Sequence, residues 1–134
     1  MNIHQFSSIL IVDDSGAVRS VVRKLLTQLG FRNLDEASDG EAALAKISEK
    51  QFGLVISDWN MEPMSGRVLL ENVRANKQYA NLPFIMMTAE SSIAKIVQAK
   101  HAGVTCFINK PFRAEELQAK IFQANTNNQS AATA

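Results

Sequence analysis

The stretch that decides the fold is Leu54-Val55-Ile56-Ser57-Asp58-Trp59-Asn60-Met61-Glu62-Pro63-Met64-Ser65-Gly66. Its first three residues are apolar without polar alternation, which predicts a short strand buried on both faces. Asp58 stands at the carboxyl end of that strand, before a turn rich in Pro, Ser and Gly. In an open parallel sheet, ligands bind outside the carboxyl ends of the strands, so Asp58 is expected at a reactive position.

Four further runs predict strands, and apolar residues at helical spacing predict a helix after each strand. The runs cover residues 8–12, 34–37, 82–88 and 105–109, of which the partly polar second suits a sheet edge. The expected helical stripes include Val18, Val21, Val22, Leu25 and Leu29, then Ala43, Leu44 and Ile47, then Val68, Leu69 and Val73, then Ile93, Ile96 and Val97, and finally Leu117 and Ile121.

Capping residues mark the ends of these predicted helices. Ser38-Asp39-Gly40, Ser65 and either Ser91 or Ser92 suit helix N-termini, and Gly30 and Gly103 suit C-terminal stops. Alternation of strands and helices with short connections predicts an α/β fold of three layers, a doubly wound five-stranded parallel sheet covered on both faces. We expect one domain over residues 1–134, with a core of about 8–124 and a flexible polar tail over 125–134.

Composition limits the function classes. A net charge of +1 and a pI of about 7.9 give no support to nucleic-acid binding. The single cysteine, Cys106, lies in an apolar run and is expected to be a buried strand residue rather than a reactive thiol. Residues 2–8 do not resemble a secretory signal, and no apolar run approaches the roughly 20 residues of a membrane span. We therefore expect a cytoplasmic protein that does not insert into membranes. We also expect a monomer.

Polar residues follow four of the five predicted strands at the same edge of the sheet. They are Asp13 and Asp14, Asp58, Thr88 and Lys110. Each alone could be a helix cap, a turn former or a solvated charge. Together they face one crevice, and that coincidence indicates a functional site.

Carboxylates gathered in this way repel one another. Two unit charges 4 Å apart cost about 4 kcal/mol at an effective dielectric constant of about 20. A hard cation offsets this repulsion, and a small number of carboxylates with room for water and a phosphate oxygen suits Mg²⁺ better than Ca²⁺. Lys110 and Thr88 could then stabilise charge on a transferring phosphoryl group, with Asp58 as the nucleophile.

Four motifs occur in order at these strand ends: Val-Asp-Asp-Ser, Ser-Asp-Trp-Asn-Met, Met-Thr-Ala-Glu and Lys-Pro-Phe. Over about residues 9–122 the chain resembles the receiver domain of bacterial two-component response regulators, particularly the single-domain CheY-like chemotaxis type. The resemblance implies a flavodoxin-like fold with strand order 2-1-3-4-5. It also implies that Asp58 accepts phosphate from a CheA-like histidine kinase and that Lys110-Pro111 is a cis peptide.

The resemblance assigns further roles. Mg²⁺ would be bound by Asp13, Asp14, Asp58 and the backbone carbonyl of Asn60. Thr88, Phe107 and Lys110 would act as switch residues. Asn60 and Glu90 would tune hydrolysis, although both could instead be exposed loop residues of no consequence, and Phe107 could be a plain core residue.

The output of such a switch is less clear from the sequence. The resemblance implies an output surface on the fourth helix, fifth strand and fifth helix, with a flagellar motor switch protein or a phosphatase as partner. Phe107 stands where motor-binding relatives have tyrosine, Glu62 separates Met61 from Pro63, and the helix after Ser91-Ser92 lacks adjacent lysines. These departures keep a second role open, that of a phosphate sink or non-motor receiver in the same kinase pathway.

Two rivals of other classes fit less well. A haloacid-dehalogenase-like phosphatase also uses an aspartate nucleophile, but it needs a second aspartate two residues later, where this chain has Asn60. A flavodoxin-like cofactor binder needs a hydroxyl- or glycine-rich phosphate loop after the first strand, which is absent. We therefore expect no enzyme activity beyond Mg²⁺-dependent self-phosphorylation and autodephosphorylation.

Overall fold

The computed structural model describes residues 8–90 and 92–133, with side chains through Asn125. In chain order the elements are β1 (Ser8–Val12), α1 (Gly16–Gln28), β2 (Asn33–Ala37), α2 (Gly40–Glu49), β3 (Leu54–Asp58), α3 (Gly66–Ala75), the 3₁₀ turn η1 (Lys77–Tyr79), β4 (Phe84–Thr88), α4 (Ile93–Ala102), β5 (Cys106–Asn109) and α5 (Ala114–Thr133). The strands form one parallel sheet in the order β2-β1-β3-β4-β5. The predicted doubly wound, flavodoxin-like fold is confirmed.

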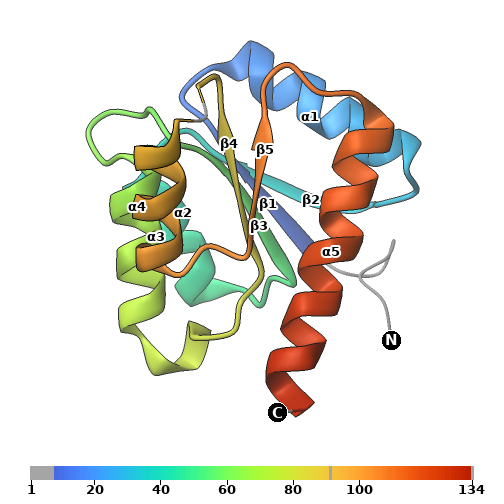
Figure 1. Cartoon of the computed structure of the whole chain (residues 1–134). Helices are drawn as coiled ribbons and strands as arrows, with labels where there is room; N and C mark the ends of the chain where they lie inside the picture. The colour runs from blue at the N-terminus through green and yellow to red at the C-terminus, as the bar shows by residue number, and fades with distance from the viewer. Residues whose placement is uncertain (1–7, 91, 134) are drawn as a thin grey trace.

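The helices cover both faces of the sheet, with α1 and α5 on one side and α2, α3 and α4 on the other (Figure 1). Alternate residues of β1 supply the two cores, because successive side chains of a strand point to opposite faces. Ile9 and Ile11 pack with the α1 and α5 residues, whereas Leu10 and Val12 pack with those of α2 and α3. The three middle strands of the sheet, β1, β3 and β4, are buried on both faces.

Several of the observed helix caps are residues that the sequence predicted as caps. Asp39, Ser65 and Ser92 are N-caps whose side chains accept hydrogen bonds from the first turns of α2, α3 and α4. Gly30 and Gly103 have φ of +99° and +94°, which glycine adopts without strain. Ser91, the alternative cap for α4, lies outside the described residues.

Several expectations are wrong in detail. Val21, Val68, Ile93 and Val97 are exposed rather than part of the core, Ile93 to 82%. In α1 the buried stripe is narrower than the run of apolar residues, and it consists of Val22, which was predicted, and Leu26, which was not. Leu82 and Pro83 precede β4, and Thr105 precedes β5. The short turn η1 was not predicted.

Helix also covers most of the segment for which a flexible polar tail is predicted. Helix α5 continues to Thr133 instead of ending near residue 124. Residues 125–133 contain neither glycine nor proline, so the sequence has no residue that would break the helix there. Among the described residues, no helix has the length and apolar character needed to cross a membrane.

Candidate functional site

Main-chain hydrogen bonds bring the predicted site residues to one edge of the sheet. The amide of Lys110 donates to the Thr88 carbonyl at 2.7 Å, and that of Asp13 donates to the Ala37 carbonyl at 3.2 Å. Asp58 pairs in register with Met87, the residue before Thr88. The sheet therefore fixes the backbone of each of these residues at the crevice.

Three carboxylates form the centre of this crevice. One carboxylate oxygen each from Asp13, Asp14 and Asp58 lies within 4.8 Å of the other two. Asp13 and Asp58 are buried, whereas Asp14 is exposed. This all-oxygen donor set fits a hard divalent cation, and the exposed side leaves room for the water ligands that Mg²⁺ keeps. The predicted position of the Asn60 carbonyl as a further ligand stays a prediction.

Lys110 places a cation inside the acid cluster. Its Nζ lies 2.8 Å from Oδ1 of Asp58 and 3.2 Å from Oδ2 of Asp13. Burial raises the pKa of Asp58, the bond from Lys110 opposes this rise, and the charge of Asp13 adds to it. Burial alone would lower the pKa of Lys110, but the bond to Asp58 and the charges of both carboxylates outweigh it, so this pKa is raised. One ammonium thus balances part of the negative charge.

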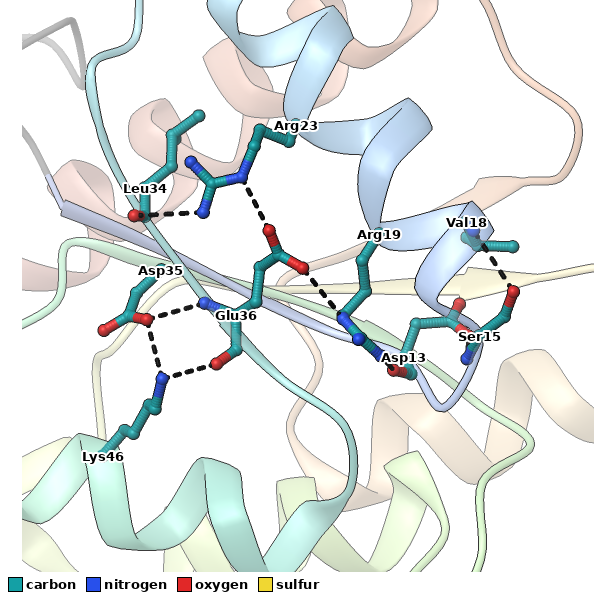
Figure 2. Close-up of polar contacts among 9 residues, drawn as sticks. All are labelled: Asp13, Ser15, Val18, Arg19, Arg23, Leu34, Asp35, Glu36 and Lys46. Carbon is teal, nitrogen blue, oxygen red and sulfur yellow. Dashed lines mark hydrogen bonds and ion pairs between the residues drawn. The ribbon is translucent and has the colours of Figure 1, made fainter.

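Asp13 is held by contacts that the sequence did not predict. Its Oδ1 accepts a hydrogen bond from the Ser15 amide at 2.9 Å, and its main-chain carbonyl accepts one from Nη1 of Arg19 at 2.6 Å (Figure 2). Arg19 is also paired with Glu36, which is distant in the sequence. Ser15 is part of the Val-Asp-Asp-Ser motif, although no contact was predicted for it, and no local signal pointed to Arg19.

Thr88 is buried at the end of β4, and its hydroxyl is engaged with the following loop. The hydroxyl donates to the Glu90 carbonyl at 2.7 Å and accepts from the Glu90 amide at 3.1 Å. The side chains of Asn60 and Glu90 are both exposed. Contact between Thr88 and a phosphate would therefore require exchange of its bond to the Glu90 carbonyl.

Phe107 is half-buried and stacks on Trp59, the residue after Asp58. The two ring centroids are 6.1 Å apart and the ring planes differ by 9°. Nζ of Lys95, in the first turn of α4, lies 5.3 Å from the centre of the Trp59 ring. A cation over an aromatic face is attracted by the ring quadrupole. These contacts connect the neighbour of Asp58 with both β5 and α4.

Two remaining expectations concern the Lys110-Pro111 peptide bond and Cys106. The Lys110-Pro111 peptide is cis, as predicted, and Glu62-Pro63 is also cis, which was not predicted. Cys106 is buried, and burial raises the pKa of its thiol to about 11. The thiol is therefore a core group, as expected.

The chain is similar to known proteins over most of its length. The family model described as "Response regulator receiver domain" matches residues 9–122. The chain is 45% identical over 113 residues to the chemotaxis protein CheY-3 of Vibrio cholerae, covering 84% of this chain and 87% of that protein. It is 43% identical to the chemotaxis protein CheY of Pseudomonas aeruginosa, covering 84% and 91%.

The chain is also similar in structure to solved proteins. The chemotaxis response regulator CheY4 of Vibrio cholerae matches with a TM-score of 0.82 and 36% identity, covering 88% of this chain and 98% of that one. A CheY-like receiver domain protein from Methanospirillum hungatei matches with a TM-score of 0.83 and 29% identity, covering 93% and 98%.

Proposed function

Because this chain belongs to the response regulator receiver domain family and is CheY-like, we propose that it is switched by a phosphoryl group transferred to Asp58 from a histidine kinase. Members of this family are receivers rather than catalytic enzymes, which disfavours the phosphatase alternative. The observation that carries the proposal is the acid cluster with its ammonium. Asp13, Asp14 and Asp58 converge to within 4.8 Å, and Lys110 bonds to two of them.

Asp13, Asp14 and Asp58 would hold Mg²⁺, with the Asn60 main-chain carbonyl as a further ligand. When bound, Mg²⁺ supplies positive charge that offsets repulsion between the carboxylates and the incoming phosphoryl oxygens. A carboxylate oxygen of Asp58 attacks phosphorus in line with the phosphohistidine nitrogen. The O–P bond forms as the N–P bond breaks, and the leaving imidazole keeps the electron pair of the broken bond.

Lys110 and Thr88 would bind the phosphoryl oxygens after transfer. Nζ of Lys110 already lies 2.8 Å from Asp58, so it needs little movement. The Thr88 hydroxyl would give up its 2.7 Å bond to the Glu90 carbonyl and donate to phosphate instead. Such charge-assisted hydrogen bonds are about twice as strong as neutral ones.

Movement of Thr88 would be coupled to Phe107 and then to the α4-β5-α5 surface. Converting a 1:99 population into 99:1 needs roughly 5.5 kcal/mol of differential binding. One ammonium and one hydroxyl on a doubly charged phosphate are a sufficient source for most of this. Asn60 and Glu90, whose side chains are both exposed, would tune the attack of water and hence the lifetime of the phosphorylated state.

The pathway we propose is chemotaxis in the cytoplasm, with a CheA-like kinase as phosphodonor. The receiver would act as a monomer and not bind nucleic acid. Its partner would be a flagellar motor switch protein or, alternatively, the chain would be a phosphate sink that no motor protein reads. Phe107 favours the sink, because its ring has no hydroxyl to offer a partner. Pull-down on a motor-switch peptide with and without beryllofluoride separates the two, and equally negligible binding contradicts the motor role.

Labelling by acetyl phosphate with Mg²⁺ tests the phosphoreceiver itself. Wild type should take one phosphoryl group, detected by intact-mass spectrometry, and Asp58→Asn should take none. Asp39→Asn is the matched control, because Asp39 is an N-cap of α2 outside the acid cluster. Stoichiometric labelling of Asp58→Asn would refute the assignment of Asp58.

A further inference from the structure

Arg19 links the edge strand of the sheet to the acid cluster. Its Nε donates to Oε1 of Glu36 at 2.9 Å, and its Nη1 donates to the main-chain carbonyl of Asp13 at 2.6 Å. Figure 2 shows the guanidinium between these two acceptors, with Ser15 beside the Asp13 carboxylate. One side chain of α1 therefore joins β2 to the end of β1.

The Asp13 carbonyl belongs to the peptide plane shared with Asp14. A peptide unit is planar, so the direction of this carbonyl also fixes where the amide and Cα of Asp14 lie. The other anchors of Asp13 act on its amide, through Ala37, and on its carboxylate, through Ser15 and Lys110. Arg19 is the anchor that acts on the link between the two neighbouring acids.

We propose that Arg19 is a positioning residue for the divalent-cation site, holding the carboxylates of Asp13 and Asp14 in the relative placement that binding requires. The proposal rests on the proposed function and extends it to a residue outside the acid cluster. Groups that orient metal ligands typically change metal affinity 10- to 100-fold when they are replaced. Since Arg19 acts on one peptide plane, we expect the lower end of that range.

Glu36 holds the guanidinium in place. The bond from Arg23 is the main reason that the pKa of Glu36 is below its ordinary value, and Arg19 adds to the effect although burial opposes it. Glu36 is therefore ionised at neutral pH and can orient Arg19. Both arginines pair with this carboxylate, Arg19 through Oε1 and Arg23 through Oε2 at 2.7 Å.

Arg23 provides a matched control. It lies one turn further along α1 and pairs with the same carboxylate, but its second hydrogen bond goes to the Leu34 carbonyl at 3.4 Å instead of to Asp13. Lysine keeps the charge of either arginine but lacks the planar fork that joins two acceptors. Arg19→Lys and Arg23→Lys therefore both keep the net charge of the protein. Only Arg19→Lys alters the contact with the Asp13 carbonyl.

The experiment titrates Mg²⁺ alone into the metal-free full chain. Trp59, the single tryptophan, adjoins Asp58 and provides a fluorescence signal, and the Mg²⁺-induced rise of the thermal midpoint is a second readout. We expect the dissociation constant for Mg²⁺ to rise about tenfold in Arg19→Lys and to stay within twofold of wild type in Arg23→Lys. The Mg²⁺-induced rise in midpoint should shrink in Arg19→Lys alone.

Equal Mg²⁺ affinities of Arg19→Lys and wild type would overturn the inference, and so would equal losses in both lysine variants. If Arg19→Lys does not fold, Glu36→Gln decides, because it removes the charge that orients Arg19. Weaker Mg²⁺ binding in Glu36→Gln than in Arg23→Lys supports the inference, and equal binding overturns it. A wild type that binds no Mg²⁺ overturns the proposed function as well, whereas the other failures affect Arg19 only.

Discussion

Nζ of Lys110 lies 2.8 Å from Oδ1 of Asp58, so the carboxylate at the end of β3 is paired with a cation that the chain itself supplies. The same ammonium reaches Asp13 at 3.2 Å. It therefore reduces a repulsion that the protein would otherwise have to overcome in folding. This arrangement gives Lys110 a structural role in addition to the proposed contact with phosphate.

Replacement of Lys110 by methionine should destabilise the metal-free protein. Removing one partner of a buried ion pair costs about 3–5 kcal/mol, and because Lys110 is partly exposed we expect about 2 kcal/mol here. Urea unfolding in EDTA measures the change, with the exposed Lys100→Met as control. Mg²⁺ should stabilise Lys110→Met more than wild type, because the cation then replaces the lost charge. Equal stability of the two methionine variants would contradict the structural role.

Asp58→Asn should be more stable than wild type at pH 7 in EDTA. Burial raises the pKa of Asp58 above its ordinary value of 3.8, so the folded state favours the protonated carboxyl. The contribution of this group to stability is therefore greatest below about pH 4 and is lost as pH rises through the folded-state pKa. Asparagine imitates the protonated form at every pH. The stability advantage of Asp58→Asn over wild type should be present at neutral pH and shrink as the pH falls toward 3.8.

Urea unfolding of wild type and Asp58→Asn from pH 3 to pH 7 checks this prediction. Groups common to both proteins cancel in the difference, which isolates Asp58. Saturating Mg²⁺ at pH 7 should reduce the advantage, because wild type has the full set of carboxylate ligands. A difference that grows toward low pH would show that the pKa of Asp58 is lowered instead.

Asn60→Arg should slow the loss of phosphate from Asp58. Asn60 is exposed and lies two residues after the proposed phosphoacceptor in the sequence, and arginine there is expected to obstruct the attacking water. We expect the lifetime to lengthen about tenfold, a change of 1.36 kcal/mol in the barrier. Decay after removal of acetyl phosphate measures the lifetime. The exposed Asn72→Arg, on α3, is the control, and equal lifetimes of the two arginine variants would place Asn60 away from the water.

The sequence predicted the sheet and its functional edge because both depend on local patterns. Apolar runs located the strands. Asp58 and Thr88 end their strands, and Asp13 and Lys110 follow theirs directly, so chain direction alone brings these residues together. Side-chain pairing was not predictable in this way. The contact of Arg19 with Glu36 joins residues 17 positions apart, and its strength depends on rotamers that no sequence spacing specifies.

The same distinction explains the errors on the surface. Val21 and Ile93 belong to apolar helical runs, but which part of a run faces the sheet depends on how the helix is rotated during packing. The stacking of Phe107 on Trp59 joins β5 to the residue that follows β3. This contact could be predicted only from the order of the strands in the sheet. The sequence thus predicted which residues converge at the edge of the sheet more reliably than the contacts that hold them in position.

Gly66 is expected to be irreplaceable by alanine, because it lies against the main chain of the phosphoacceptor. A Cβ at Gly66 would stand 2.0 Å from the Asp58 carbonyl oxygen, which is backbone and cannot move aside cheaply. The amide of Gly66 also donates to the Trp59 carbonyl at 2.8 Å, so α3 cannot withdraw without breaking this bond. Gly66→Ala should cost about 2 kcal/mol or more in free energy of unfolding.

Gly16→Ala is the matched control, because Gly16 is likewise the first residue of its helix and its Cβ would meet only the Arg19 side chain at 3.5 Å. That variant should stay within about 1 kcal/mol of wild type. Urea unfolding measures both, and acetyl-phosphate labelling should fall in Gly66→Ala alone, since displacement of the Asp58 backbone moves the carboxylate. If the two alanine variants unfold at the same urea concentration, the close approach of α3 to β3 does not constrain residue 66.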